Sequence, residues 1–437
     1  MTETFETAAV ELWETWPELS PEEAVERFHA LPPDERDDFF QSLDPREQAQ
    51  LLTVLAPRER RLWLRLLAPD DVADLIQESA AGEREPLLAL LDDPTQTDVR
   101  ALLAYAEDEA GGLMSPRFAR VRPDMTVREA IPYLRRQAAA AETIYYVYVL
   151  DEHQHLLGVL SFRDLFRATE DQVVRDIMHT RLVTVPETLD QEAVGRLYVE
   201  HDLFAVPVID AERRMKGIIT FDDIAEVVRE EATEDIQKVG GTQTLDMPYI
   251  QVPLLTLVRK RASWLAVLFL GEMLTASAMA HFEEEIAHAV VLALFVPLII
   301  SSGGNAGSQA STLVIRAMAI AEVRLRDWWR VLRRELGAGL LLGIALGAIG
   351  LVRILVWQAA SGIYGAHYLR LAVTVSCSLV GVVLWGSVSG SMLPFLLRRL
   401  GFDPASASAP FVATLVDVTG LVIYFTVAAI VLRGTLL

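Results

Sequence analysis

Two carboxylates stand inside long apolar runs of the C-terminal half of the chain. Asp417 lies in the middle of FVATLVDVTGLVIYF with no basic residue near it in sequence, and Glu272 lies in a similar run with Thr275 and Ser277. A charge in a bilayer core is costly, so such side chains usually face a pore, a cavity or a polar partner. We expect Asp417 to line a pore or a polar cavity. The structural alternative is that it caps or hydrogen-bonds to a neighbouring helix. For Glu272 a position beside the pore and a structural role are equally expected.

A second group of carboxylates is crowded into one predicted helix, within EVVREEATEDIQK at 226–238 and the residues just before it. Spacings of three and four place several of them on one helix face, where like charges repel unless a cation screens them. Divalent-cation binding and a merely solvated face both remain open. The acids are Asp222, Asp223, Glu226, Glu230, Glu231, Glu234 and Asp235.

The polar stretch SSGGNAGSQ at 301–309 interrupts an apolar run. It lacks the GK[ST] ending of a phosphate-binding loop. We expect it to break a membrane helix, so that free backbone carbonyls and Asn305 could meet a hydrated cation; a break made for packing is the alternative.

Charge and hydropathy divide the chain into two parts. Residues 1–258 hold 51 of the 60 acids and 25 of the 39 Lys and Arg, whereas the remainder is apolar with basic fringes. An acidic body does not suit nucleic acid, because phosphates need cationic contacts. The single cysteine, Cys377, excludes an intramolecular disulfide and a thiolate zinc cluster.

Five apolar runs are long enough to cross a bilayer. Basic residues cluster before the first, between the second and third, and between the fourth and fifth, so these loops and the N-terminal part are expected in the cytoplasm and the C-terminus outside. The runs are about 262–281, 286–318, 334–358, 370–396 and 409–432.

An internal repeat lies within 110–240. YVYVLDEHQHLLGVLSFRDL and FAVPVIDAERRMKGIITFDDI align, with Gly158 matching Gly217. Each copy predicts strand, turn, strand and helix. The layout resembles a tandem pair of cystathionine-β-synthase (CBS) modules, at 110–172 and 173–238. In that superfamily a Ser/Thr-x-x-Asp element contacts the ribose of adenosine nucleotides, which makes Ser161 with Asp164 and Thr220 with Asp223 candidate nucleotide-binding residues.

The remaining cytoplasmic segments are simpler. Residues 1–109 form a run of short helices that start at Pro or Asp, which predicts an all-α superhelical domain without a catalytic constellation. Residues 239–260 are expected to connect the CBS pair to the membrane part, as a connecting or plug helix, and 261–437 to form an all-α domain of five membrane helices.

With this order of domains, the chain resembles the MgtE family of magnesium channels over nearly its full length. The strings that carry the resemblance are DEAGGLMS at 108–115, AETIYYVYVLDE at 141–152, EEATEDI at 230–236, GGNAGSQ at 303–309, LPFLLRRLGFDP at 393–404 and VATLVDVTG at 412–420.

The resemblance implies a homodimer in the cell membrane, with a pore on its two-fold axis that passes Mg²⁺ and is closed by cytosolic Mg²⁺. Asp417 from both protomers would bind a largely hydrated ion, with the backbone oxygen of Ala413 and the side chain of Asn305 beside it. The sensor acids that the resemblance implies are Asp190, Glu192, Asp202, Asp223, Glu226, Glu231, Glu234 and Asp235, with Asp403 at the cytoplasmic mouth facing the connecting helix. N-domain acids such as Asp71, Asp92 and Asp93 would oppose them, and ATP at the CBS pair would tune the response.

Two departures from the family pattern and two competing interpretations complete the analysis. Ala409 stands before Pro410 where family members carry Asn, and Glu272 replaces an uncharged residue. Glu272 favours the alternative of a coupled transporter that exchanges Mg²⁺ for Na⁺ or H⁺. We do not expect an enzyme, because no catalytic set such as HExxH or Ser/His/Asp is apparent. One carboxylate per chain does not determine the choice among Mg²⁺ and other divalent cations.

Overall fold

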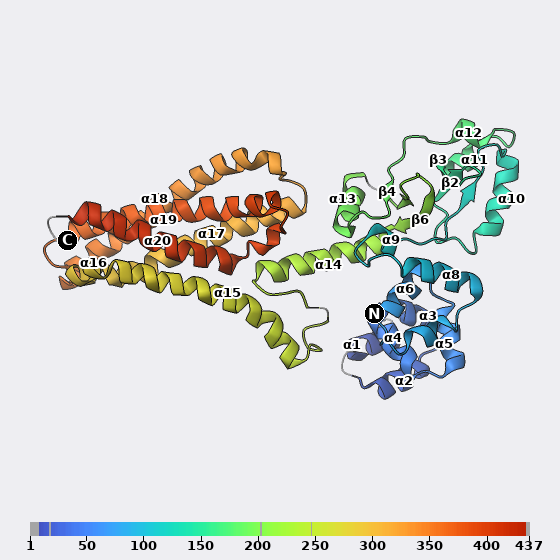
Figure 1. Cartoon of the computed structure of the whole chain (residues 1–437), viewed down its shortest axis with the longest axis horizontal. Coiled ribbons are helices and arrows are strands. Elements are labelled where there is room, and N and C mark those ends of the chain that lie inside the picture. The colour runs from blue at the N-terminus through green and yellow to red at the C-terminus, as the bar shows by residue number, and fades with distance from the viewer. Residues whose placement is uncertain (1–7, 17–18, 202, 246, 434–437) are drawn as a thin grey trace, which may run out of the picture. The chain divides into compact units, whose positions relative to one another are not determined.

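The computed structural model describes residues 8–16, 19–201, 203–245 and 247–433. The chain forms two compact units, residues 1–230 and 231–437. The first holds the N-terminal helices and the CBS pair, and the second holds the end of helix α14 and the membrane helices (Figure 1).

The N-terminal helices are short because a proline restarts the helix every twelve residues. Five helices begin at a proline, whose missing N–H costs nothing in the first turn, and Ser20 and Asp44 close capping boxes before two of them. The aromatic rings of Phe28, Phe40 and Trp63 pack at their centre. The helices are α1 (Ala8–Thr15), α2 (Pro21–Ala30), α3 (Pro33–Ser42), α4 (Pro45–Val54), α5 (Pro57–Leu64), α6 (Pro69–Glu78), α7 (Arg84–Leu88) and α8 (Asp93–Leu102).

Each CBS copy contains a three-stranded sheet in which the first strand pairs parallel to the second and the second pairs antiparallel to the third. The first copy has α9 (Ala110–Leu113), β1 (Arg120–Val121), α10 (Val127–Gln137), β2 (Tyr146–Leu150), β3 (Leu156–Ser161) and α11 (Phe162–Arg167). The second has α12 (Val174–Ile177), β4 (Val185–Pro186), α13 (Gln191–His201), β5 (Ala205–Ile209), β6 (Met215–Thr220) and α14 (Phe221–Val239).

The two matching glycines of the repeat are required for the same structural reason. A Cβ on Gly158 would lie 2.6 Å from Sδ of Met178, and one on Gly217 would lie 2.6 Å from the carbonyl oxygen of Ser115. Each glycine therefore lets the entry segment of the other copy cross its strand. The predicted repeat and its α/β character are confirmed.

The predicted connecting helix at 239–260 is wrong in its position. The helix is α14, which ends at Val239, and the described residues from Gly240 to Pro253 form turns and extended segments. Gly241 has φ of +73°, a conformation that ends a helix, and Pro248 and Pro253 follow before the next helix starts at Leu254.

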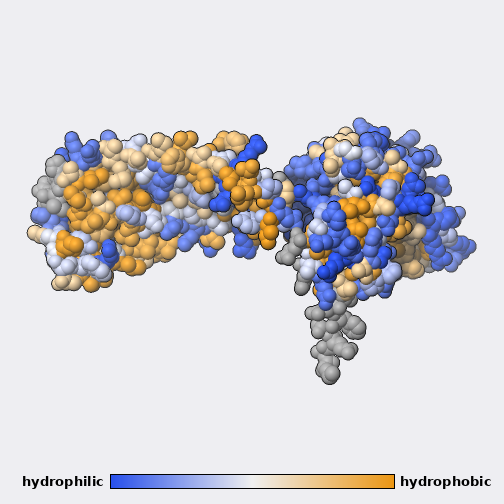
Figure 2. Space-filling view, turned by 90° about the horizontal axis from the view of Figure 1, so that it is seen from below, coloured by the Kyte–Doolittle hydropathy of each residue, from blue (hydrophilic) through white to orange (hydrophobic). Residues whose placement is uncertain are grey.

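The five predicted membrane spans are confirmed as helices. They are α15 (Leu254–His281), α17 (Val296–Ala319) with the 3₁₀ turn η2 (Val290–Phe295) before it, α18 (Trp328–Ser361) preceded by η3 (Leu325–Asp327), α19 (Tyr368–Arg399) and α20 (Ala409–Leu432). Two short elements complete this unit, α16 (Glu283–His288) and η4 (Pro404–Ser406). Hydrophobic side chains cover much of its outer surface (Figure 2).

The predicted helix break at 301–309 is wrong, because α17 runs through SSGGNAGSQ without interruption. Its glycines are packing sites: a Cβ on Gly307 would lie 2.8 Å from Val412 of α20 and 3.0 Å from the carbonyl oxygen of Gly386 of α19. Close approach of neighbouring helices outweighs the poor helix propensity of glycine. The backbone carbonyls in this stretch stay within the helix.

Candidate cation sites

The intramembrane site lies where α20 meets α17. A Cβ on Gly304 would lie 3.4 Å from Oδ1 of Asp417 and 3.4 Å from Cβ of Ala413, one turn earlier on α20. Asn305 follows Gly304 directly, and its exposed amide donates to Oγ of Ser301 (3.5 Å). The structure therefore places Asp417, Ala413 and the backbone at Asn305 at one level of the bundle.

Glu272 belongs to the same place. α15 packs along α20 (Figure 1), and the charge of Glu272 acts on Asp417. The neighbouring Gly271 allows this approach, since a Cβ there would lie 2.6 Å from Cγ2 of Thr414. The structure thus gives Glu272, which the sequence left undecided, a partner in the candidate site.

The end of α14 is held to the membrane helices by an ion pair. Nζ of Lys238, on the last turn of α14, lies 2.6 Å from Oδ2 of Asp403 and also contacts Glu234. Asp403 in addition accepts a hydrogen bond from the backbone N–H of Ala405. Val239 packs beside this pair on Ala405 and Ala407, so the end of α14 is attached to the loop that precedes α20.

A third site joins the N-terminal domain to the CBS pair. Asp70, Asp71 and Asp74 of α6 face Asp223, and their charges act on one another. Asp70 is only 6% exposed, and its Oδ1 has no hydrogen-bond partner. A buried carboxylate oxygen without a partner is costly, so the pairing of α6 with α14 requires something that compensates the negative charge.

The pKa values in this cluster respond to that crowding. Burial, and then the carboxylates around it, raises the pKa of Asp74 to about 8. Burial also raises the pKa of Asp223 to about 7. The hydrogen bonds from Thr220 lower this pKa, and the charges of Asp222 and Asp71 raise it further. The pKa of Asp70 lies well above its usual range for the same reason, burial first and then Asp223.

The rim of the cluster carries further acids. Burial raises the pKa of Glu142, and the charges of Asp71 and Asp222 raise it further. The charge of Glu226 raises the pKa values of Asp71 and Asp74, and Glu226 also forms an ion pair with Arg229 (2.9 Å). In the part of the chain that the structure describes, no three such side chains converge closely enough to enclose a bare ion. We call the α6 residues Asp70, Asp71 and Asp74 together with Asp223 and Glu226 the interdomain acidic cluster.

We expect a pH dependence from this cluster. Its raised pKa values mean that the folded protein holds protons that the unfolded chain, with carboxyl pKa values near 3.8, has released. The free energy of unfolding must then fall as pH rises from about 4 to about 8. In metal-free buffer the thermal midpoint of the full chain in detergent should drop by several degrees over that range. The Asp74→Asn, Asp223→Asn double variant should lose most of this slope, and an equal slope in both proteins would contradict the prediction.

Several predicted sensor acids make local contacts away from this cluster. Asp92 caps α8 and accepts from the N–H of Thr95 (3.0 Å), and Asp93 follows it on the exposed first turn. Asp190 accepts from the N–H of Glu192 (3.0 Å), and Glu192 pairs with Arg196. Asp202 lies outside the described residues, and Glu231 and Asp235 lie on α14 beyond the cluster.

Asp70 and Asp74 are missing from the predicted sensor residues. Their signal was available in LAPDDVADLI, because Asp70, Asp71 and Asp74 fall within one turn of a single predicted helix. What the sequence could not show is that this turn lies within electrostatic reach of Asp223 and Glu226 on α14.

The two predicted nucleotide elements form matching helix caps with different surroundings. Oγ of Ser161 lies 2.6 Å from Oδ2 of Asp164, and Oγ1 of Thr220 lies 2.7 Å from Oδ2 of Asp223. Asp164 also faces Nε2 of His179 (3.3 Å), whereas Asp223 belongs to the acidic cluster. Only the first element offers a nucleotide a site that is not surrounded by carboxylates.

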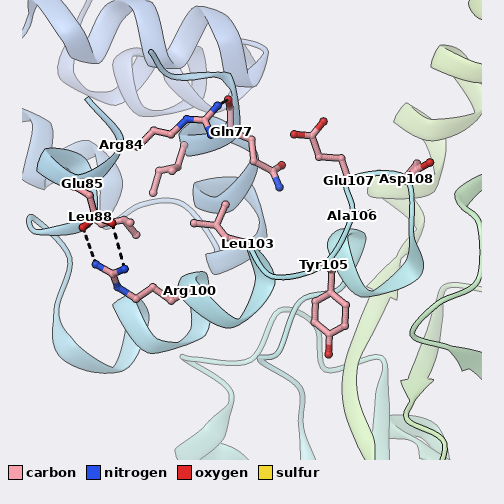
Figure 3. A pocket seen from close by; sticks show the side chains of 11 residues that line it. Gln77, Arg84, Glu85, Leu88, Arg100, Leu103, Tyr105, Ala106, Glu107 and Asp108 are labelled. Carbon is pink, nitrogen blue, oxygen red and sulfur yellow. Dashed lines mark hydrogen bonds and ion pairs between the residues drawn. The ribbon is translucent and has the colours of Figure 1, made fainter. Parts of the chain in front are cut away.

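One cavity was not expected from the sequence. An open pocket of about 680 Å³ lies between α6, α7, α8 and the segment 103–108. Its basic side chains are already engaged: Arg100 pairs with Glu85 (2.8 Å), and Arg84 donates to the carbonyl oxygen of Gln77 (Figure 3). Arg84 also donates to the carbonyl oxygen of Ser79. The pocket therefore offers no unengaged basic side chain to an anionic ligand.

Comparison with known proteins places this architecture in a family. The model of the divalent cation transporter MgtE matches residues 296–427, that of the MgtE intracellular N domain matches 7–108, and the CBS domain matches 110–171 and 174–230. A solved structure described as the cytosolic domain of the Mg²⁺ channel MgtE in complex with ATP is 42% identical, with a TM-score of 0.48, and covers 51% of this chain and 91% of that one.

Two curated relatives extend the similarity over most of the chain. The magnesium transporter MgtE of Thermus thermophilus is 46% identical over 370 residues, which cover 84% of this chain and 80% of the relative. That of Enterococcus faecalis is 36% identical over 337 residues, which cover 77% and 72%. The matches confirm the resemblance and the expectation that the protein is not an enzyme. The chain belongs to the MgtE family of magnesium transporters, and it is a multi-pass membrane protein with a helical N-domain, a CBS pair and five apolar helices.

Proposed function

We propose that this transporter is a Mg²⁺-selective channel for magnesium uptake that closes when Mg²⁺ accumulates in the cytosol. The observation that carries the proposal is the position of Asp417, a carboxylate in the middle of α20 that lies against Gly304 of α17. The channel is a homodimer with Asp417 of both protomers on its path, its N-terminal domains in the cytoplasm and its C-terminus outside.

The chemistry of Mg²⁺ suits this site. Mg²⁺ releases its water reluctantly and prefers octahedral oxygen coordination. Two Asp417 carboxylates with the carbonyl oxygen of Ala413 and the amide of Asn305 provide oxygens around a hydrated ion. Selection then rests on charge and on the size of the hydrated ion.

The gate uses the interdomain acidic cluster. Without a cation, the carboxylates of α6 and α14 repel, and the buried Oδ1 of Asp70 lacks a partner. Cytosolic Mg²⁺ compensates the charge and holds the two helices together. α14 carries the acids of the cluster at its start and the Lys238 contact with Asp403 at its end, so the state of the cluster reaches the mouth of the bundle through one helix.

The experiment is Mg²⁺ uptake by vesicles that contain the full chain, with internal Mg²⁺ set low and then high. A gated channel takes up Mg²⁺ at low internal Mg²⁺, at a rate that follows the electrochemical gradient, and stops at high internal Mg²⁺. Uptake that is insensitive to internal Mg²⁺ would contradict the gate. Empty vesicles provide the control.

ATP is proposed as a ligand of the first CBS copy. Ser161 and Asp164 would contact ribose hydroxyls, and His179, which lies 3.3 Å from Asp164, adds a group that can carry positive charge. We expect Asp164→Ala to weaken ATP binding at least about tenfold, the cost of a lost charge-assisted hydrogen bond, measured by equilibrium titration of the full chain in detergent. Asp151→Ala, in the turn at the opposite end of the β2–β3 hairpin, is the matched control, and equal loss in both variants would reject the site.

Coupled exchange of Mg²⁺ for Na⁺ or H⁺ is the second candidate. The contact between Glu272 and Asp417 favours it, because paired carboxylates can exchange one cation for another. An imposed Na⁺ or H⁺ gradient would then drive Mg²⁺ uptake against its own gradient, which a channel does not allow.

A further inference from the structure

Glu272 stands at the candidate filter in an apolar setting. Its neighbour Gly271 packs against α20, where a Cβ would lie 2.6 Å from Cγ2 of Thr414, and the charge of Glu272 acts on Asp417. One turn later on the same helix the hydroxyl of Thr275 is buried without a partner. Both residues belong to α15, a fully described helix that buries none of its residues. Polar side chains are costly on a lipid-exposed helix, so two of them at the same depth require a shared explanation.

Neither helix supplies a counter-charge. Lys and Arg are absent from 262–281 of α15 and from 409–432 of α20. Two carboxylates accept hydrogen bonds but cannot donate them when ionised, and their repulsion is strong where water is scarce. Positive charge at this level therefore has to come from outside the two helices.

We propose that Glu272 is a specificity-determining residue of the cation path, a second carboxylate that faces the same ion as Asp417. The inference rests on the proposed role of Asp417 and adds to it. With Glu272 the path carries two carboxylates per protomer, which favours divalent over monovalent cations because attraction grows with the charge of the ion. The Oγ1 of Thr275 is available to the water shell of that ion.

The test measures Na⁺ flux through vesicles that hold the full-length protein, with low internal Mg²⁺ and increasing external Mg²⁺ as the blocking ion. Glu272→Gln should raise the half-blocking Mg²⁺ concentration about tenfold, the effect of removing one nearby charge. Glu272→Asp should give a smaller rise, because it keeps the charge on a shorter side chain. Glu335→Gln, a carboxylate on α18, is the matched control and should block like the wild type.

The outcomes separate this inference from the proposed channel. If Asp417→Asn weakens the Mg²⁺ block but Glu272→Gln leaves it unchanged, the role of Glu272 is refuted and the path at Asp417 stands. If neither variant changes the block, both assignments are wrong. Elution of each variant as a single species in detergent checks that it has assembled. If Glu272→Gln fails that check, the test rests on Glu272→Asp, and a half-blocking Mg²⁺ concentration equal to that of the wild type would overturn the proposal.

Discussion

Vesicles that contain the Asp417→Asn protein are expected to take up Mg²⁺ about a hundredfold more slowly than wild type, since a carboxylate contributes several kcal/mol to a nearby cation at intermediate dielectric. Asn keeps the size of the side chain and its contact with Gly304, so the bundle should still assemble. The loss should therefore appear in the flux and not in the yield or in the thermal midpoint. The measurement is dye-reported Mg²⁺ entry at low internal Mg²⁺, where the gate is open.

Glu335→Gln is the control for this prediction, because it also neutralises a carboxylate of the membrane unit but lies near the start of α18. It should conduct like wild type. Wild-type flux in Asp417→Asn would place the ion path elsewhere in the bundle, and the assignment of Ala413 and Asn305 would fail with it.

Neutralising the buried end of the interdomain acidic cluster is expected to leave the channel open at high internal Mg²⁺. The Asp70→Asn, Asp74→Asn double variant should raise the internal Mg²⁺ concentration that halves uptake by about tenfold or more, because two of the charges that attract the ion are gone. Neither residue caps a helix end, so the effect reports on the cluster and not on local structure.

A stability measurement adds an independent test. In metal-free buffer the same variant should unfold at a higher temperature than wild type, because the repulsion between α6 and α14 is relieved; added Mg²⁺ should then raise its midpoint less than that of wild type. Asp37→Asn removes an exposed charge of the N-terminal domain, on α3, and serves as the control. An unchanged response to internal Mg²⁺ in the double variant would exclude the cluster as the sensor.

The parts of the fold that were predictable depend on strong local patterns. A run of about 20 apolar residues can cross a bilayer only as a helix. In the N-terminal domain, a proline marks where each of five short helices begins. The CBS repeat was visible because Gly158 and Gly217 meet the same steric demand in both copies. The carboxylate at Asp417 was found from its cost in lipid alone.

The errors arose where packing outweighs local preference. Glycines at 303, 304 and 307 predict a broken helix in isolation, yet contacts with α19 and α20 keep α17 intact. The burial of Asp70 and the half-burial of Asp74 were hidden for a related reason, because an acidic turn on an amphipathic helix is normally solvated. Only the folded chain shows that Asp223, distant in sequence, acts on this turn.

The glycine contacts also determine which helices around the candidate cation site are joined most closely. A Cβ on Gly343 would lie 2.8 Å from the backbone of Val380, and one on Gly307 would lie 3.0 Å from that of Gly386, so α17, α18 and α19 meet backbone to backbone. α15 buries none of its residues, and its Gly271 meets only the side chain of Thr414. A displacement of α15 against these three helices would carry Glu272 with it, so a single movement would change both the width and the charge of the proposed path.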